Sequence, residues 1–182
     1  VRVAAPTPMM IPDFPARFTC HLPRLRARPA LPGDRSLLRR IITLDTEHML
    51  GDVPADARRM IVAVQAEGRL NLSRRGYPAA TCLLLEAGEE VIGLAMVDLR
   101  RGLALLLELI ILPPWRGQGY GGEALAGLCA QADAGGWVLE ASVFYDSPVR
   151  NFFHKAGFAP SREEGLELVL LRRPTGRKGA AG

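Results

Sequence analysis

The chain has 182 residues, which is enough for one well-buried domain and short for two. Hydrophobic residues make up 48% and charged residues 23% of the sequence, and this ordinary globular composition excludes a wholly disordered chain. The formal net charge of +4 suits an anionic ligand. A nucleic-acid partner is not expected, because the basic residues do not gather into a dense stretch with interleaved aromatic residues.

The three cysteines, Cys20, Cys82 and Cys129, are odd in number and widely spaced. They form neither a disulfide framework nor a zinc-binding pattern, which predicts a cytoplasmic protein without a metal site. The longest apolar run, Leu103 to Pro114, is interrupted by Glu108 and is too short to cross a bilayer. No membrane association is therefore expected.

The start of the chain is rich in proline and lacks a sustained hydrophobic period. We therefore predict a loosely ordered N-terminal arm over residues 1–23, one domain over residues 24–173 and a flexible tail over residues 174–182. The basic residues of the tail are expected to be solvated. The same role is expected for Arg24, Arg26 and Arg28.

The first part of the domain is predicted to form a strand and two helices. Leu25 to Ala30 alternates as a short strand does. Asp34 follows a Pro-Gly turn and is expected to cap the first helix, and a second helix begins near Pro54. Gly68 to Gly76, which contains Arg69, is polar and glycine-bounded and is predicted to be a connector.

Three strands are predicted next, over Ala80–Glu86, Val91–Leu99 and Leu103–Leu112. The turns between them are so short that neighbouring strands must run antiparallel. These segments therefore predict an antiparallel meander.

Helices and strands alternate in the second half of the domain. A helix ends at Gly135, a strand spans Trp137–Phe144, a further helix ends at Gly157, and Leu166–Leu171 is the last strand. The strand–helix–strand crossover makes one parallel pair. The predicted fold class is therefore α+β, with a mixed, mostly antiparallel sheet.

A glycine-dense loop from Gly117 to Gly122 lies between the meander and the next helix. Several backbone N–H groups can converge there on one anion, at a helix N-terminus whose unpaired donors and dipole favour negative charge. Its glycine spacing also matches a dinucleotide fingerprint, with Glu140 as the ribose-binding acid. A dinucleotide domain is disfavoured, because three antiparallel strands precede the loop and too few strand–helix units follow it.

A second template fits better. It is Arg116-x-x-Gly119-x-Gly121 after the meander, followed by Asp146-Ser-Pro-Val-Arg-Asn-Phe-Phe-His-Lys-Ala-Gly-Phe158. With these two motifs in this order, the chain resembles the GNAT superfamily of acetyl-CoA-dependent N-acetyltransferases from about Leu25 to Arg172. The resemblance implies helices on both faces of the sheet, a splayed central strand pair and acetyl-CoA as the acyl-donor co-substrate.

The resemblance also implies a set of cofactor-binding residues. One strand edge would pair with the pantetheine amides, the glycine loop would hold the pyrophosphate, and a bulge near Glu108 to Ile110 would splay the strand. Asp146 stands where many relatives have an asparagine that touches the cofactor. The residues concerned are Leu109, Ile110, Ile111, Arg116, Gly117, Gln118, Gly119, Tyr120, Gly121, Gly122, Asp146 and Phe153.

Acetylation of an amine needs a base for the amine proton, and the departing thiolate can take up a proton. Glu108 interrupts the apolar strand beside the pantetheine edge and is the favoured base, directly or through water. Glu140 on the neighbouring strand is the alternative. Phe153 stands where the family often has a tyrosine that protonates the thiolate, and Tyr145 is the candidate replacement.

These observations predict transfer of acetyl from acetyl-CoA to a primary amine of a small molecule or a protein by direct attack. Phe153 keeps one alternative open, a non-catalytic acyl-CoA-binding sensor or interaction module of the same fold. A sheet rich in edges favours a homodimer. The acceptor site is expected between Thr43 and Tyr77, where four side chains can attract a cationic amine: Glu47, His48, Asp52 and Asp56.

Overall fold

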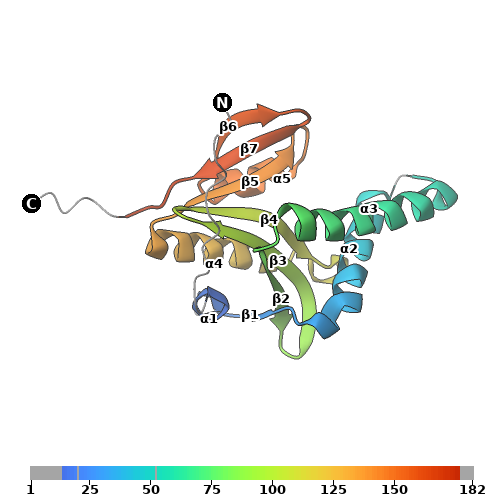
Figure 1. The fold of residues 1–182 in the computed structure, drawn as a ribbon, viewed down its shortest axis with the longest axis horizontal. Coiled ribbons are helices and arrows are strands. Elements are labelled where there is room, and N and C mark those ends of the chain that lie inside the picture. Colours follow the sequence, from blue (N-terminus) through green and yellow to red (C-terminus); the bar gives the residue numbers. More distant parts are fainter. Residues whose placement is uncertain (1–13, 20, 52, 177–182) are drawn as a thin grey trace, which may run out of the picture.

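A seven-stranded sheet in the order β1-β2-β3-β4-β5-β7-β6 forms the middle layer of the protein, with helices on both faces (Figure 1). The structure is a computed structural model that describes residues 14–19, 21–51 and 53–176. Its strands are β1 (Arg26–Pro29), β2 (Thr81–Ala87), β3 (Glu90–Arg100), β4 (Leu103–Ile111), β5 (Val138–Phe144), β6 (Ala159–Glu164) and β7 (Glu167–Arg172). Its helices are α1 (Phe14–Thr19), α2 (Arg35–Met49), α3 (Ala55–Gly76), α4 (Tyr120–Gly135) and α5 (Val149–Lys155), with short 3-10 turns η1 (Pro32–Asp34) and η2 (Pro113–Trp115).

Strands β2, β3 and β4 form the predicted antiparallel meander, and β1 pairs antiparallel with β2 at its edge. The turns that join β2 to β3 and β3 to β4 contain Gly88 and Gly102, whose φ angles are +62° and +75°. Only glycine adopts such angles without steric cost, which is why these short turns close cleanly.

The parallel pair β4 and β5 is splayed, as expected. Pairing runs only from Leu103 with Val138 to Leu106 with Ala141. Beyond this point β4 continues to pair with β3, while β5 continues to pair with β7. The β3–β4 register shifts so that Met96 faces Glu108 and Val97 faces Leu106. This leaves Leu107 as the bulged residue, at the N-terminal border of the predicted region.

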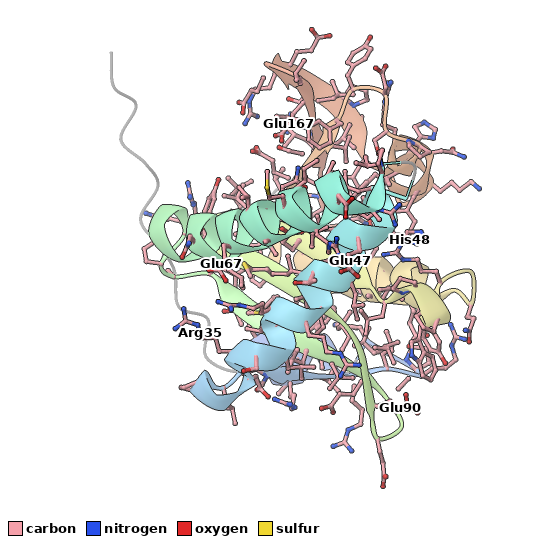
Figure 2. All side chains as sticks on the ribbon, turned by 90° about the vertical axis from the view of Figure 1, so that its right-hand side faces the viewer. Arg35, Glu47, His48, Glu67, Glu90 and Glu167 are labelled. Atoms are coloured by element: carbon pink, nitrogen blue, oxygen red, sulfur yellow. The ribbon has the colours of Figure 1, made fainter. Side chains whose placement is uncertain are left out.

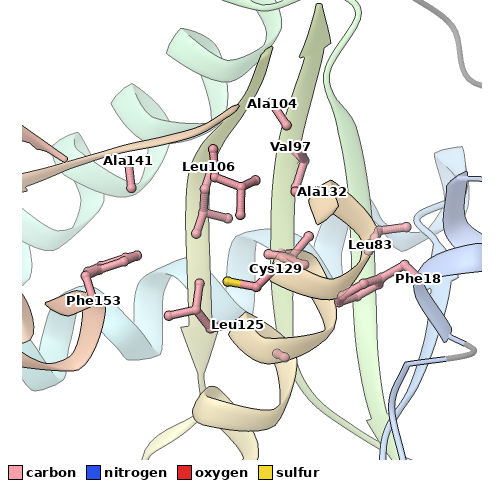
Figure 3. Close-up of a cluster of buried hydrophobic side chains, with 14 of the residues drawn as sticks. Phe18, Leu83, Val97, Ala104, Leu106, Leu125, Cys129, Ala132, Ala141 and Phe153 are labelled. Carbon is pink, nitrogen blue, oxygen red and sulfur yellow. The ribbon is translucent and has the colours of Figure 1, made fainter. Parts of the chain in front are cut away.

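Two hydrophobic cores lie on the two faces of the sheet, because successive strand side chains point to opposite sides. The larger core joins the sheet to α1, α4 and α5 (Figure 3) and includes Leu83, Leu106, Leu125 and Phe153. The second core joins the sheet to α2 and α3 and includes Leu84, Leu94, Ile110, Ile41 and Ala66.

The N-terminal boundary of the domain differs from the prediction of an arm over residues 1–23. Residues 14–19 form α1, and its Phe14 and Phe18 are 2% and 0% exposed in the larger core. Burying one such ring is worth about 1.5–3 kcal/mol, so this segment belongs to the domain. Residues 1–13 of the expected arm lie outside the described residues.

The predicted connector from Gly68 to Gly76 is wrong, because α3 continues through it to Gly76. A glycine inside a helix costs about 1 kcal/mol relative to alanine. Here that cost is outweighed, since Ala66 and Leu70 pack in the second core and Arg69 makes ion pairs with α2 and β4. One strand was also missed: β6 is exposed at every position and therefore shows no alternation.

No helix in the described part of the chain is both long and apolar enough to cross a bilayer.

Candidate active site

A cavity of about 320 Å³ opens where β4 and β5 diverge. It lies on the side of the sheet covered by α3. Leu105 to Leu107 and Ala141 supply its apolar lining. Its polar lining comes from α3, β4, β5, β7 and the residue after α3, namely Arg69, Glu108, Glu140, Ser142, Glu167 and Tyr77.

The edge of β4 that faces β5 has no strand neighbour from residue 107 to residue 111 within the described structure. Leu109, Ile110 and Ile111 lie on this edge, and their side chains pack into the two cores. Their backbone groups are thus held in place while one side of the strand stays available. An extended amide-bearing chain can pair with such an edge as an added strand would.

The glycine loop leads from the end of β4 into α4. Gly117 and Gly119 have φ angles of +72° and +87°, so both positions need glycine. The first bond that enters α4 runs from the Glu123 N–H to the Gly119 carbonyl at 3.0 Å. The N–H groups of the first turn before Glu123 therefore have no carbonyl within the helix, and they and the helix dipole favour an anion here. The predicted loop residues are brought together at this mouth.

Arg116 is held by protein partners. Its Nε donates to the Ile111 carbonyl at 2.7 Å, and its Nη2 donates to Asp45 Oδ1 at 2.7 Å. Asp45 lies on α2 and is only 8% exposed. The side chain of Arg116 thus ties the glycine loop to the end of β4 and to α2.

Asp45 also contacts Arg69, which in turn holds Glu108. Arg69 Nη1 donates to Asp45 Oδ2 at 2.9 Å. Its Nε and Nη2 donate to Glu108 Oε1 and Oε2 at 2.9 and 2.6 Å. Burial lowers the pKa of Arg69, but hydrogen bonds and charges from Glu108 and Asp45 outweigh it and raise the pKa above its ordinary value. A permanently charged guanidinium therefore fixes the orientation of the predicted base.

Glu140, the alternative base, is paired with a residue of the missed strand. Arg162 of β6 donates to its two carboxylate oxygens at 3.2 and 2.9 Å, and also donates to Glu164. Hydrogen bonds to Glu140 and Glu164 raise the pKa of Arg162. Glu167 also lines the cavity, and no cation pairs with it among the described residues.

The residues predicted around the thiolate are not brought together at this cavity. Phe153 is 7% exposed and packs edge-on against Phe152 and Phe158, with ring centroids 5.4 and 5.2 Å apart. Tyr145 is 51% exposed, does not line the cavity, and its ring lies 5.2 Å from the Arg150 guanidinium carbon. Asp146 is exposed beside Tyr145.

The predicted acceptor residues on α2 and α3 lie away from the cavity. Glu47 and His48 are exposed on α2, and Figure 2 shows them apart from Glu167. Asp56 is exposed and paired with Arg59, and Asp52 lies outside the described residues. From the region expected to form the acceptor site, residues 43–77, Arg69 and Tyr77 line the cavity instead.

The sequence motifs carry no signal for Arg69, Arg162 or Glu167. Each arginine acts across a large sequence separation: Arg69 pairs with Glu108 across 39 residues and Arg162 with Glu140 across 22. A charge pattern along one element cannot reveal such pairs. Recognition of β6 as a strand would have placed Arg162 next to β7, the strand that pairs with the β5 strand of Glu140.

Comparisons with known proteins identify a family for this chain and solved structures of the same fold. Residues 51–158 match the model of the acetyltransferase (GNAT) family, which is more than half of the chain. The fold matches the PaiA N-acetyltransferase of Thermoplasma acidophilum in complex with coenzyme A, with a TM-score of 0.65 and 15% identity over 82% of this chain and 98% of that one. It matches an acetyltransferase of Thermus thermophilus with a TM-score of 0.62 and 25% identity, over 84% of this chain and 99% of that one. It also matches an acetyl transferase of Salmonella typhimurium that modifies the N-terminal serine of ribosomal protein L7/L12. The TM-score is 0.58 and the identity 15%, over 85% of this chain and 98% of that one.

Proposed function

Because the chain belongs to the acetyltransferase (GNAT) family, we propose that it transfers the acetyl group of acetyl-CoA to a primary amine by direct attack. The observation that carries this proposal is the position of Glu108. This carboxylate lines the cavity where β4 and β5 diverge and lies next to the open edge of β4. Donor, acceptor and base can therefore meet at one point.

The donor side of the proposal rests on the glycine loop and on the β4 edge. The loop offers backbone N–H groups at the N-terminus of α4, which suits the pyrophosphate of coenzyme A. Residues 109–111 offer backbone groups to the amides of the pantetheine arm. An extended ligand held at both points carries its thioester toward the opening between β4 and β5.

The acceptor side rests on the charge of the cavity. Three carboxylates line it, from Glu108, Glu140 and Glu167, and the guanidiniums of Arg69 and Arg162 offset two of these three charges. An amine that arrives protonated is attracted by this excess of negative charge. A small amine and the N-terminus of a protein both present such a group, and the Salmonella protein of the same fold acts on an N-terminal serine.

A protonated amine loses two protons on the way to an amide: the first is removed before attack, and the second leaves the nitrogen as the C–S bond breaks and is taken up by the thiolate or by solvent. Glu108, directly or through one water, takes the first proton, and the amine nitrogen then attacks the thioester carbonyl carbon. The C–S bond breaks, the acetyl group forms an amide, and the sulfur leaves as thiolate. Arg69 occupies one acceptor site on each Glu108 oxygen, and a carboxylate has about four such sites, so the ion pair leaves room for the amine proton.

The thiolate does not need an acid on α5. A thiol with a pKa of about 8.5 is a tolerable leaving group near neutral pH, so the departing thiolate can take its proton from solvent. Phe153, which carries no hydroxyl, is compatible with this route. Tyr145 remains a candidate acid only if it moves from its exposed position beside Arg150.

The test measures thiol release from acetyl-CoA with a panel of polyamines, aminoglycosides, amino acids and short peptides. With the acceptor found, Glu108→Gln is expected to lower kcat by about 10²–10⁴-fold and to leave acetyl-CoA affinity unchanged. Glu86→Gln is the matched control, because it breaks an Arg–Glu pair between β1 and β2, that of Arg28 with Glu86. Unchanged turnover in Glu108→Gln, with loss in Glu140→Gln, would move the base to Glu140.

One observation favours a second candidate, an acyl-CoA-binding module that does not transfer the acetyl group. Glu108 and Glu140 are both engaged by arginines, and Phe153 lacks the hydroxyl that relatives often carry. Such a module would bind acetyl-CoA yet release no thiol with any amine of the panel. Turnover that depends on Glu108 would exclude it.

A further inference from the structure

Arg24 lies at the mouth of the glycine loop, although it is far from that loop in the sequence. It precedes β1 and falls outside the residues that match the family model. The backbone N–H groups of Arg24 and Leu25 donate to Glu123 Oε1 at 2.7 and 2.9 Å. The chain before β1 is thereby fastened to the first turn of α4.

The guanidinium of Arg24 is held over the loop by three contacts. Its Nε donates to Glu123 Oε2 at 2.8 Å, and its Nη1 donates to the Gln118 carbonyl at 3.1 Å. Its central carbon lies 4.6 Å from the centre of the Tyr120 ring. A side chain fixed in this way loses little further freedom when it binds a ligand.

The third nitrogen, Nη2, has no hydrogen-bond partner among the described residues. It lies 3.2 Å from the point that a Cβ atom on Gly119 would occupy. Half of the Arg24 side chain, 51%, is exposed to solvent. A charged donor therefore remains available beside the loop whose backbone N–H groups favour an anion.

Glu123 gives this arrangement an electrostatic reason. It is the acidic residue in the first turn of α4, where its charge would repel a phosphate bound at the helix N-terminus. The Glu123 side chain is 7% exposed, and its oxygens are occupied by Arg24 and by two backbone N–H groups. Arg24 thus offsets the unfavourable charge and presents Nη2 as a hydrogen-bond donor.

We propose that Arg24 is a phosphate-binding residue that completes the anion site of the glycine loop, with Nη2 donating to an oxygen of the coenzyme A pyrophosphate. This inference rests on the proposed function, because it requires coenzyme A to occupy the loop. Arginine suits the role, since its planar guanidinium donates in directions that match phosphate oxygens.

The test is calorimetric titration of the unmodified chain and of Arg24→Ala with coenzyme A, 3′-dephospho-coenzyme A and pantetheine. Arg24→Ala is expected to weaken coenzyme A and its dephospho form alike, by about tenfold or more, and to leave pantetheine unaffected. Arg24→Lys keeps the charge but loses the planar guanidinium, and its affinity for coenzyme A is expected to lie between those of the unmodified chain and Arg24→Ala. Arg26→Ala is the matched control, because Arg26 is exposed two residues further on.

The outcomes separate the possible errors. Equal weakening of pantetheine would mean that Arg24 acts only through the fold, and loss confined to coenzyme A would assign it to the 3′-phosphate; either result overturns the proposal. Normal affinity of a folded Arg24→Ala variant would overturn this inference alone. An unmodified chain that binds no coenzyme A would refute the proposed function and this inference together. Glu123→Gln added to Arg24→Ala is expected to restore part of the affinity, because it removes the negative charge that Arg24 no longer offsets.

Discussion

Asp45 joins the glycine loop to the candidate base through two arginines, and Asp45→Asn is the substitution that tests this link. The carboxylate accepts from Arg116 at 2.7 Å and from Arg69 at 2.9 Å. Asparagine keeps one oxygen but replaces the other with an NH₂ group, which is a donor. One of the two arginines then faces a donor instead of an acceptor; Arg116 loses the carboxylate it is paired with, and Arg69 keeps its pair with Glu108.

The expected cost follows from the burial of the group. Removing one partner of a buried ion pair costs about 3–5 kcal/mol. The Asp45 side chain is 12% exposed, but Arg69 and Arg116 are 24% and 32% exposed, so water can reach both cations. We therefore expect the low end, about 3 kcal/mol, which lowers Tm by about 6–12 °C in a chain of this size.

The assay is urea unfolding with thermal melting as a second readout. Asp56→Asn is the matched control, because Asp56 is 91% exposed in its pair with Arg59 and is expected to change stability by less than about 0.5 kcal/mol. If Asp45→Asn is as stable as Asp56→Asn, the network contributes no net stability and this reasoning is refuted.

Two further predictions concern the fold. Gly93→Ala is expected to destabilise by about 3 kcal/mol or more, because its Cβ would lie 2.0 Å from the Ile110 carbonyl oxygen. Gly68 lies on α3, and a Cβ atom there would meet no atom within 4 Å, so Gly68→Ala is expected to stabilise the protein by up to about 1 kcal/mol. Equal urea midpoints for the two variants would contradict both expectations. The hydrogen bond from Arg172, ahead of bonds from Thr175, lowers the pKa of Asp133 to about 2. This pair therefore stabilises fully above pH 4 and loses its effect as the pH falls toward 2; a stability gap between wild type and Asp133→Asn that stays constant over this range would refute it.

Features that depend on local backbone chemistry could be predicted from the sequence. The glycine loop, the meander and the end of a helix at Gly135 can each be recognised from a few consecutive residues, because turns and caps need particular residue types. The splayed strand pair followed from the resemblance built on these features. The interior of the site could not be found in this way, since Arg69 and Arg162 reach their carboxylates from distant elements.

Two errors of element assignment have the same physical origin. Gly68 by itself favours a break in the helix, yet the packing of Ala66 and Leu70 decides the conformation there. Phe14 and Phe18 lie among prolines, and their six-residue helix is stabilised by the larger core, not by its own propensity. Tertiary contacts that override local preference are invisible to any reading of short windows.

The central claim, that the glycine loop binds acetyl-CoA, is tested most directly by isothermal titration of the purified chain with acetyl-CoA, with NAD as the control. We predict a Kd in the micromolar range, which is a binding free energy of about −8 kcal/mol, and no heat of binding with NAD. Binding of NAD, or no binding of acetyl-CoA by the folded chain, would contradict it.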